Sequence, residues 1–148
     1  MARTGDRDDP SARERLDERL AAAFADLGGP ALVVGMDTPQ VRPELLAHGL
    51  ARLSRAPAVI GPALDGGYWA IGLRKPDERA LLGVPMSRAS TCAHQLARLR
   101  DLGLEAVVLP TLRDVDTAAD AAAVAPTLGS ASAFRTAVAA AGLRERIA

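Results

Sequence analysis

The stretch Ala31-Leu-Val-Val-Gly-Met-Asp-Thr-Pro39 decides the predicted fold of this chain. A short apolar run, rich in β-branched residues, ends abruptly at an acidic turn, and Gly28-Gly29-Pro30 precedes it. Such a run with turn signals at both ends is typical of a fully buried strand in a parallel sheet. Ligands of open α/β sheets bind beyond the carboxyl ends of the strands, so Asp37 lies where a site is expected.

The same pattern occurs three more times and predicts strands at residues 58–60, 68–73 and 106–109. Apolar residues at helical spacing predict helices at residues 11–27, 43–54, 87–102, 117–128 and 131–147. Strands that alternate with helices predict an α/β fold, a three-layer sandwich with a mostly parallel sheet. The connection over residues 61–67 is either a hairpin turn or a loop whose extra length serves a function.

Length and composition indicate one domain. The chain has 148 residues, of which 49% are hydrophobic and 24% are charged, enough to bury one core. We expect a disordered or loosely docked tail over residues 1–11 and a single domain over residues 12–148. Eighteen basic residues balance eighteen acidic ones, so charge does not indicate a nucleic-acid or membrane partner.

The sequence also predicts a cytoplasmic location. It has no apolar signal core and no run of about 18 apolar residues that could span a bilayer. The lone cysteine, Cys92, lies in a helical pattern, and we expect a buried structural thiol in a reducing compartment.

Three acidic turns, at Asp37, Asp65 and Asp116, each follow a predicted strand. Two such turns at one sheet edge would form an oxygen-ligand site for a hard divalent cation. Mg²⁺ is the natural candidate because it uses one or two carboxylates together with waters and substrate phosphates. The alternative is that each Asp only caps the following helix. Gly66 and Gly67 either let the backbone approach a ligand or form a plain turn.

Four motifs occur in the order and approximate spacing seen in a bacterial family of glycosyltransferase-A-like (GT-A-like) proteins of unassigned function. The motifs are Gly35-Met-Asp-Thr-Pro39, Gly61-Pro-Ala-Leu-Asp-Gly-Gly-Tyr-Trp-Ala-Ile-Gly-Leu73, Val84-Pro-Met-Ser87 with Thr91, and Leu112-Arg-Asp-Val-Asp-Thr117. That family resembles the guanylyltransferases of phospholactate, phosphoenolpyruvate and molybdenum-cofactor metabolism. The resemblance covers roughly residues 16–125 and implies a nucleotide-diphospho-sugar transferase fold of the GT-A type.

The resemblance also implies a site. It places Mg²⁺ on Asp37 and Asp116, with Asp114 as the alternative ligand. The loop Asp65-Gly66-Gly67-Tyr68 would face the acceptor or the sugar-like half of the donor. Ser87, opening the next predicted helix, would add a hydroxyl or a helix N-terminus for an anion. No catalytic nucleophile is implied, because positioning and neutralisation of phosphate charge supply the rate.

The sequence departs from the family at its start. Relatives begin with a strand and a Gly-containing basic loop that holds the nucleotide phosphates, and nothing before Leu16 has that pattern. We therefore expect the chain to lack the first strand or strands of the fold, and the uncovered sheet to favour a homodimer.

The expected function is Mg²⁺-dependent glycosyl or nucleotidyl transfer. The donor would be a nucleotide or nucleotide-sugar, and the acceptor a small phosphorylated or carboxylated molecule. The alternative is a truncated, non-catalytic binding or assembly protein of the same fold. Fold-level resemblance does not choose between them, because one architecture hosts many activities.

Overall fold

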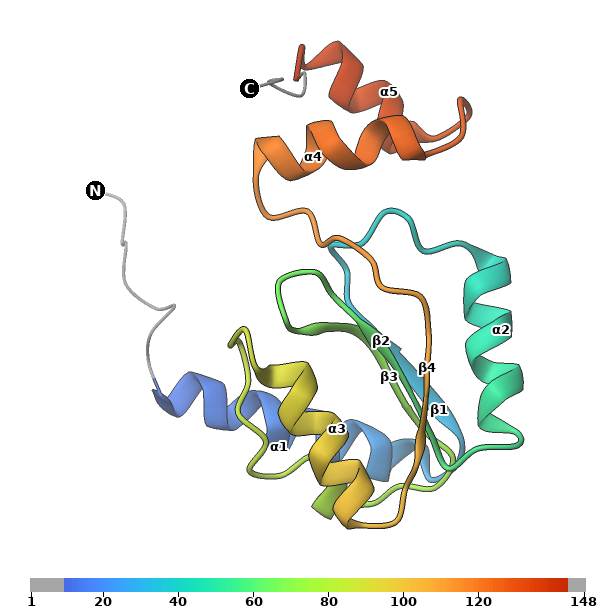
Figure 1. The fold of residues 1–148 in the computed structure, drawn as a ribbon, viewed down its shortest axis with the longest axis vertical. Coiled ribbons are helices and arrows are strands. Elements are labelled where there is room, and N and C mark those ends of the chain that lie inside the picture. Colours follow the sequence, from blue (N-terminus) through green and yellow to red (C-terminus); the bar gives the residue numbers. More distant parts are fainter. Residues whose placement is uncertain (1–9, 144–148) are drawn as a thin grey trace.

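Four strands form one open, mixed sheet within residues 10–143, the part of the chain that this computed structural model describes (Figure 1). The strands are β1 (Ala31–Val34), β2 (Ala58–Pro62), β3 (Tyr68–Leu73) and β4 (Ala106–Val108). Their order across the sheet is β1-β3-β2-β4, with β3 antiparallel to both neighbours and β2 parallel to β4. Each strand lies where an apolar run predicted it.

The prediction of a mostly parallel sheet is wrong, because β3 runs against the other three strands. Only residues 63–67 connect β2 to β3. A parallel pair needs a crossover of about a dozen residues or more, so this short connection closes an antiparallel hairpin. β3 still forms a continuous apolar run because it is buried along almost its whole length. The other three strands point in one direction.

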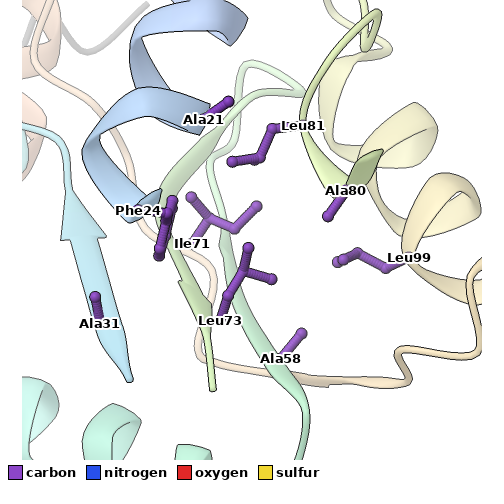
Figure 2. Packing of buried hydrophobic residues seen from close by; sticks show 9 residues of the cluster. All are labelled: Ala21, Phe24, Ala31, Ala58, Ile71, Leu73, Ala80, Leu81 and Leu99. Atoms are coloured by element: carbon purple, nitrogen blue, oxygen red, sulfur yellow. The ribbon is translucent and has the colours of Figure 1, made fainter. Parts of the chain in front are cut away.

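Helices cover both faces of the sheet, as a three-layer fold requires. They are α1 (Pro10–Leu27) and α3 (Thr91–Asp101) on one face and α2 (Pro43–Leu53) on the other (Figure 1). Figure 2 shows the first face, where Phe24 of α1 and Leu99 of α3 pack in one cluster with Ile71 of β3. Burial of this apolar surface from both sides is the main force that holds the layers together.

Trp69 is the largest side chain of the second face, and it is 1% exposed. It packs in one cluster with Leu53 of α2 and Leu109. Its Nε1 donates a hydrogen bond to the Pro110 carbonyl at 2.9 Å, which satisfies the one polar group of the buried ring. A side chain at Gly61 would overlap the indole, so only glycine fits there. The expectation that Trp69 belongs to the core is confirmed.

A capping box starts α4 (Ala118–Val124), as the sequence indicated at Thr117. The Thr117 Oγ1 accepts a hydrogen bond from the Asp120 backbone N–H at 3.1 Å, and Asp120 Oδ2 accepts one from the Thr117 backbone N–H at 3.0 Å. Together they satisfy donors that a helix start leaves free. A 3₁₀ turn over Ala125–Thr127 follows, so the predicted helix to residue 128 is only partly α-helical.

The last described helix, α5 (Ala133–Ala140), is shorter than predicted. Gly142 has a φ of 68°, and this left-handed backbone ends the helix in the usual way of a C-terminal glycine. The predicted continuation to residue 147 extends beyond residue 143 and lies outside the described residues. α4 and α5 pack on each other at the end of the molecule where the sheet loops gather (Figure 1).

The first helix ends where the sequence indicated, at Leu27, followed by Gly28 with a φ of 67°. The tail predicted over residues 1–11 lies outside the described residues except for Pro10 and Ser11, which already belong to α1. Among residues 10–143, no helix has the length and apolarity needed to cross a bilayer. Cys92 is buried and free, as predicted, and burial raises the pKa of its thiol.

Gly66 and Gly103 form a matched pair for testing the hairpin loop. Both have a positive φ, but a side chain at Gly66 would collide with the Ala89 carbonyl, whereas nothing lies within 4 Å of a side chain at Gly103. We expect Gly103→Ala to lower the free energy of unfolding by about 1 kcal/mol, the cost of left-handed backbone. Gly66→Ala should lower it by roughly 3 kcal/mol, because the loop must also move. Equal losses in urea unfolding would contradict the observed packing of the loop.

Candidate functional site

Three loops meet at one end of the sheet. Because β1, β2 and β4 point in the same direction, the segments that follow them lie at the same edge. These segments are residues 35–42, 63–67 and 109–117. Each brings one carboxylate to a shared cavity, and these carboxylates are Asp37, Asp65 and Asp114. The expectation that acidic turns gather at one sheet edge is therefore met for two of the three predicted aspartates.

Backbone hydrogen bonds join the three loops into one unit. The Val115 N–H donates to the Asp37 carbonyl at 2.8 Å, which ties the last loop to the first. The Leu64 N–H donates to the Leu112 carbonyl at 2.9 Å, and the Leu112 N–H donates to the Pro62 carbonyl at 3.0 Å. The loops that carry the carboxylates are thus held together by main-chain bonds.

The cavity has a volume of about 370 Å³, and two chemically different groups of residues line it. One group is the three carboxylates. The other is apolar and includes Leu16 and Leu20 from α1, Val33 from β1, Ile71 from β3 and Met86. A volume of this size suits a small molecule or part of a larger one.

The predicted site residues divide into two groups. Asp37, Asp65, Gly67, Tyr68, Ser87 and Asp114 all line the cavity. Gly66 and Asp116 do not line it. Asp116 is exposed, and its backbone N–H donates to Asp120 Oδ2 at 3.3 Å at the start of α4. The structure therefore brings the alternative ligand, Asp114, together with Asp37.

Burial and neighbouring charges change the acidity of Asp114. Burial raises its pKa to about 6, and the negative charges of Asp37, Asp65, Asp116 and Asp120 add to the effect. Its Oδ1 is buried and has no hydrogen-bond partner. A cation or a hydrogen-bond donor at this oxygen would relieve both the repulsion and the missing bond.

Asp65 is fixed by its own loop. Its Oδ1 accepts a hydrogen bond from the Gly67 backbone N–H at 2.8 Å, an Asx turn that orients the carboxylate. Gly66 holds the loop against the start of α3, because its carbonyl accepts a hydrogen bond from the Cys92 N–H at 2.9 Å. Gly66 therefore acts in loop packing, while its neighbours Asp65 and Gly67 line the cavity.

Tyr68 is the first residue of β3, and it lines the cavity. Burial raises the pKa of its phenol, and nearby Cys92 and Asp17 add to the shift. Its hydroxyl donates a hydrogen bond to the Met86 Sδ at 3.6 Å, which is a weak acceptor. The phenol therefore stays protonated and can offer its hydroxyl to a ligand.

Ser87 was predicted to open a helix, and this is wrong. It has a φ of 57°, the left-handed conformation, which no helical residue adopts. α3 begins at Thr91 after the cap residue Ser90. Ser87 thus offers the cavity a hydroxyl but no helix N-terminus for an anion.

The sequence reasoning missed the contribution of α1. Leu16 and Leu20 line the cavity, and Asp17 between them is only 6% exposed. The Asp17 Oδ2 accepts a hydrogen bond from the Gly83 N–H at 2.7 Å, and its buried Oδ1 has no partner within residues 10–143. A signal was present, because position 17 falls on the apolar face of the predicted helix, four residues before Ala21.

The fit of a metal ion can be judged from these oxygens. Within residues 10–143, no group of three or more His, Cys, Asp or Glu side chains is arranged to hold a metal. Mg²⁺ needs only one or two carboxylates and takes its other oxygens from water and substrate phosphates. Asp37 and the unpartnered Asp114 Oδ1 supply such a pair at one cavity. The residues fit Mg²⁺ when a phosphorylated substrate completes the shell.

Comparison with solved structures defines the class of fold. The chain is similar to a "putative nucleotide-diphospho-sugar transferase" from Desulfovibrio desulfuricans G20, with 30% sequence identity and a TM-score of 0.70. The similarity covers 88% of this chain and 65% of that protein, so this chain spans less than two thirds of its length. No curated protein matches the chain.

Residues 9–88 match the family described as "Uncharacterized protein conserved in bacteria (DUF2064)". This match covers more than half of the chain, and the chain belongs to that family. The matched region contains Asp37, the hairpin loop with Asp65, and Ser87.

The raised pKa of Asp114 predicts a dependence of stability on pH. Its pKa rises from 3.8 to about 6 on folding, so the folded chain holds the proton longer than the unfolded chain, and ionisation above that pKa destabilises the fold. Asp114→Asn should therefore raise the free energy of unfolding at pH 8 by about 1 kcal/mol, allowing for partial exposure, with a smaller gain toward pH 4. Urea unfolding at both pH values measures this.

Asp101→Asn is the control, because this exposed residue lies at the far end of α3. It should leave stability unchanged at both pH values. A loss of stability in Asp114→Asn at pH 8, or the same change at both pH values, would contradict the described destabilisation of the Asp114 carboxylate by burial and neighbouring charges.

Proposed function

We propose that this chain is a Mg²⁺-dependent transferase that moves a glycosyl or nucleotidyl group from a nucleotide or nucleotide-sugar donor to a small acceptor. One observation carries the proposal: three loops at the carboxyl end of the sheet bring Asp37, Asp65 and Asp114 to one cavity. The likeness to the solved protein from Desulfovibrio desulfuricans supports a transferase role. A GT-A fold and the relation to guanylyltransferases are part of this proposal.

The carboxylates have separate roles in this proposal. Asp37 and Asp114 hold the cation, because both line the cavity and Asp114 Oδ1 has no other partner. Asp116, which the family resemblance implies as a ligand, is exposed and does not line the cavity. Mg²⁺ at this place would neutralise negative charge on the donor phosphates. Asp65 also lines the cavity and is the carboxylate that faces the acceptor in this proposal.

The other groups that line the cavity orient the substrates and keep water away from them in this proposal. The apolar side chains of Leu20, Val33 and Ile71 exclude water from part of the cavity, which strengthens electrostatic interactions inside it. The Tyr68 hydroxyl is a hydrogen-bond donor at the same cavity. Binding and orientation of two substrates, without a nucleophilic side chain, can account for a transfer of this kind.

A non-catalytic binding or assembly role is the second candidate, and one observation favours it. No Lys, Arg or His lies among the residues that line the cavity within the described part of the chain. Donor phosphates would therefore depend on the cation alone for charge neutralisation. Formation of a homodimer, expected from the uncovered sheet, stays a prediction.

Calorimetric titration separates the two candidates. The chain is titrated with GTP, then with other nucleotides and UDP-sugars, with and without Mg²⁺. We expect binding that requires Mg²⁺ and that weakens at least about tenfold in Asp37→Asn and Asp114→Asn, because each removes a charge from the cation site. The best ligand identifies the reaction class.

Two variants control this titration. Asp101→Asn should bind like the parent chain. Asp116→Asn should also bind nucleotide like the parent chain if Asp114 is the second ligand of the cation. If nucleotide binding weakens in Asp116→Asn and not in Asp114→Asn, Asp116 is the second ligand instead. Absence of nucleotide binding by the folded chain would overturn the transferase proposal in favour of the non-catalytic role.

A further inference from the structure

The charges around the cavity have one sign. Every charged side chain that lines it within the described residues is an aspartate: Asp37, Asp65 and Asp114. In addition to burial and Cys92, the negative charge of Asp17 raises the pKa of the Tyr68 phenol. Unlike charges across a binding site select partners, and like charges reject them. An acceptor with its own carboxylate or phosphate would meet repulsion here.

One residue that lines the cavity has a buried oxygen without a donor. The Oδ1 of Asp114 has no hydrogen-bond partner among the described residues. An unsatisfied buried acceptor costs about 1–3 kcal/mol. A ligand that brings hydroxyl or amine hydrogens into this region would recover part of that cost, whereas an anionic ligand has none to give.

Much of the cavity lining is apolar. It includes Leu16, Leu20, Val33 and Met86. A ligand that fills the cavity must therefore have an apolar body as well as a polar head. The carboxylates and the apolar residues line one volume of about 370 Å³, so a single small molecule can contact both.

We infer that the acceptor is a small amphipathic molecule whose reacting head is a hydroxyl or an amine, neutral or cationic, with no carboxylate or phosphate of its own. The inference rests on the proposed transferase function and names its acceptor class. With the cation on Asp37 and Asp114, Asp65 is the carboxylate that receives the head group. The sequence led to the opposite expectation, a phosphorylated or carboxylated acceptor.

Calorimetric titration with probes that differ only in the head group provides a direct test. Three probes share one apolar body and differ in the head group: cyclohexylmethylamine, cyclohexylmethanol and cyclohexanecarboxylate. Each is titrated at neutral pH without Mg²⁺ or nucleotide. We expect the amine and the alcohol to bind at least about tenfold more tightly than the carboxylate.

Asp65→Asn is the matched variant, because an amide oxygen can still accept the bond from the Gly67 N–H while the charge is lost. It should weaken binding of the amine and reduce the difference in affinity between the amine and the carboxylate. Asp101→Asn should change neither affinity. Equal or tighter binding of the carboxylate, no binding of any probe, or an unaltered preference in Asp65→Asn would overturn the inference. Mg²⁺-dependent nucleotide binding is measured in a separate titration. The transferase proposal can therefore be supported even if these probes contradict the acceptor class.

Discussion

The hydrogen bond from the Val115 N–H to the Asp37 carbonyl, 2.8 Å long, connects the segment after β4 to the segment after β1. These segments are far apart in the sequence, and this bond holds Asp114 beside the first loop together with a bond from Gln40 Nε2 to the Arg113 carbonyl at 3.0 Å. The bonds of Leu112 with the β2–β3 connection complete the arrangement. One cavity with three carboxylates depends on this set of main-chain contacts.

Holding these carboxylates together has an electrostatic cost. Burial raises the pKa of Asp114, and repulsion from Asp37 and Asp65 adds to this effect; its buried Oδ1 has no partner among the described residues. Strain of this kind is common at functional sites, where stability is given up for ligand binding. Ser87, the one non-glycine residue with a positive φ among the described residues, lines the same cavity.

Sequence patterns located the strands well, because apolar runs with turn signals identify buried strands regardless of their partners. They did not give the direction of β3, since a strand buried on both faces has the same apolar run in either orientation. The five residues 63–67 did carry that information, because so short a connection cannot cross over to a parallel strand. Trp69 and Cys92 were placed correctly in the core because burial follows from residue type and helical or strand period.

The sequence predicted site residues only where they follow the end of a strand. Asp37 and Asp65 follow strands directly, whereas Asp114 and Asp116 lie in an irregular segment where no period indicates which side chain turns inward. The sequence did not predict the start of α3 correctly, because the hydrophobic pattern does not indicate the left-handed backbone of Ser87. A cation-binding site on Asp37 and Asp114, beside the loop that carries Asp65, is the central claim, and paramagnetic broadening of amide signals by Mn²⁺, a substitute for Mg²⁺, tests it most directly. We predict that substoichiometric Mn²⁺ broadens the signals of Gly35, Gly67 and Asp114 together, that excess Mg²⁺ restores them, and that Gly103 stays sharp. Broadening limited to one loop, or spread evenly over the chain, would contradict a shared site.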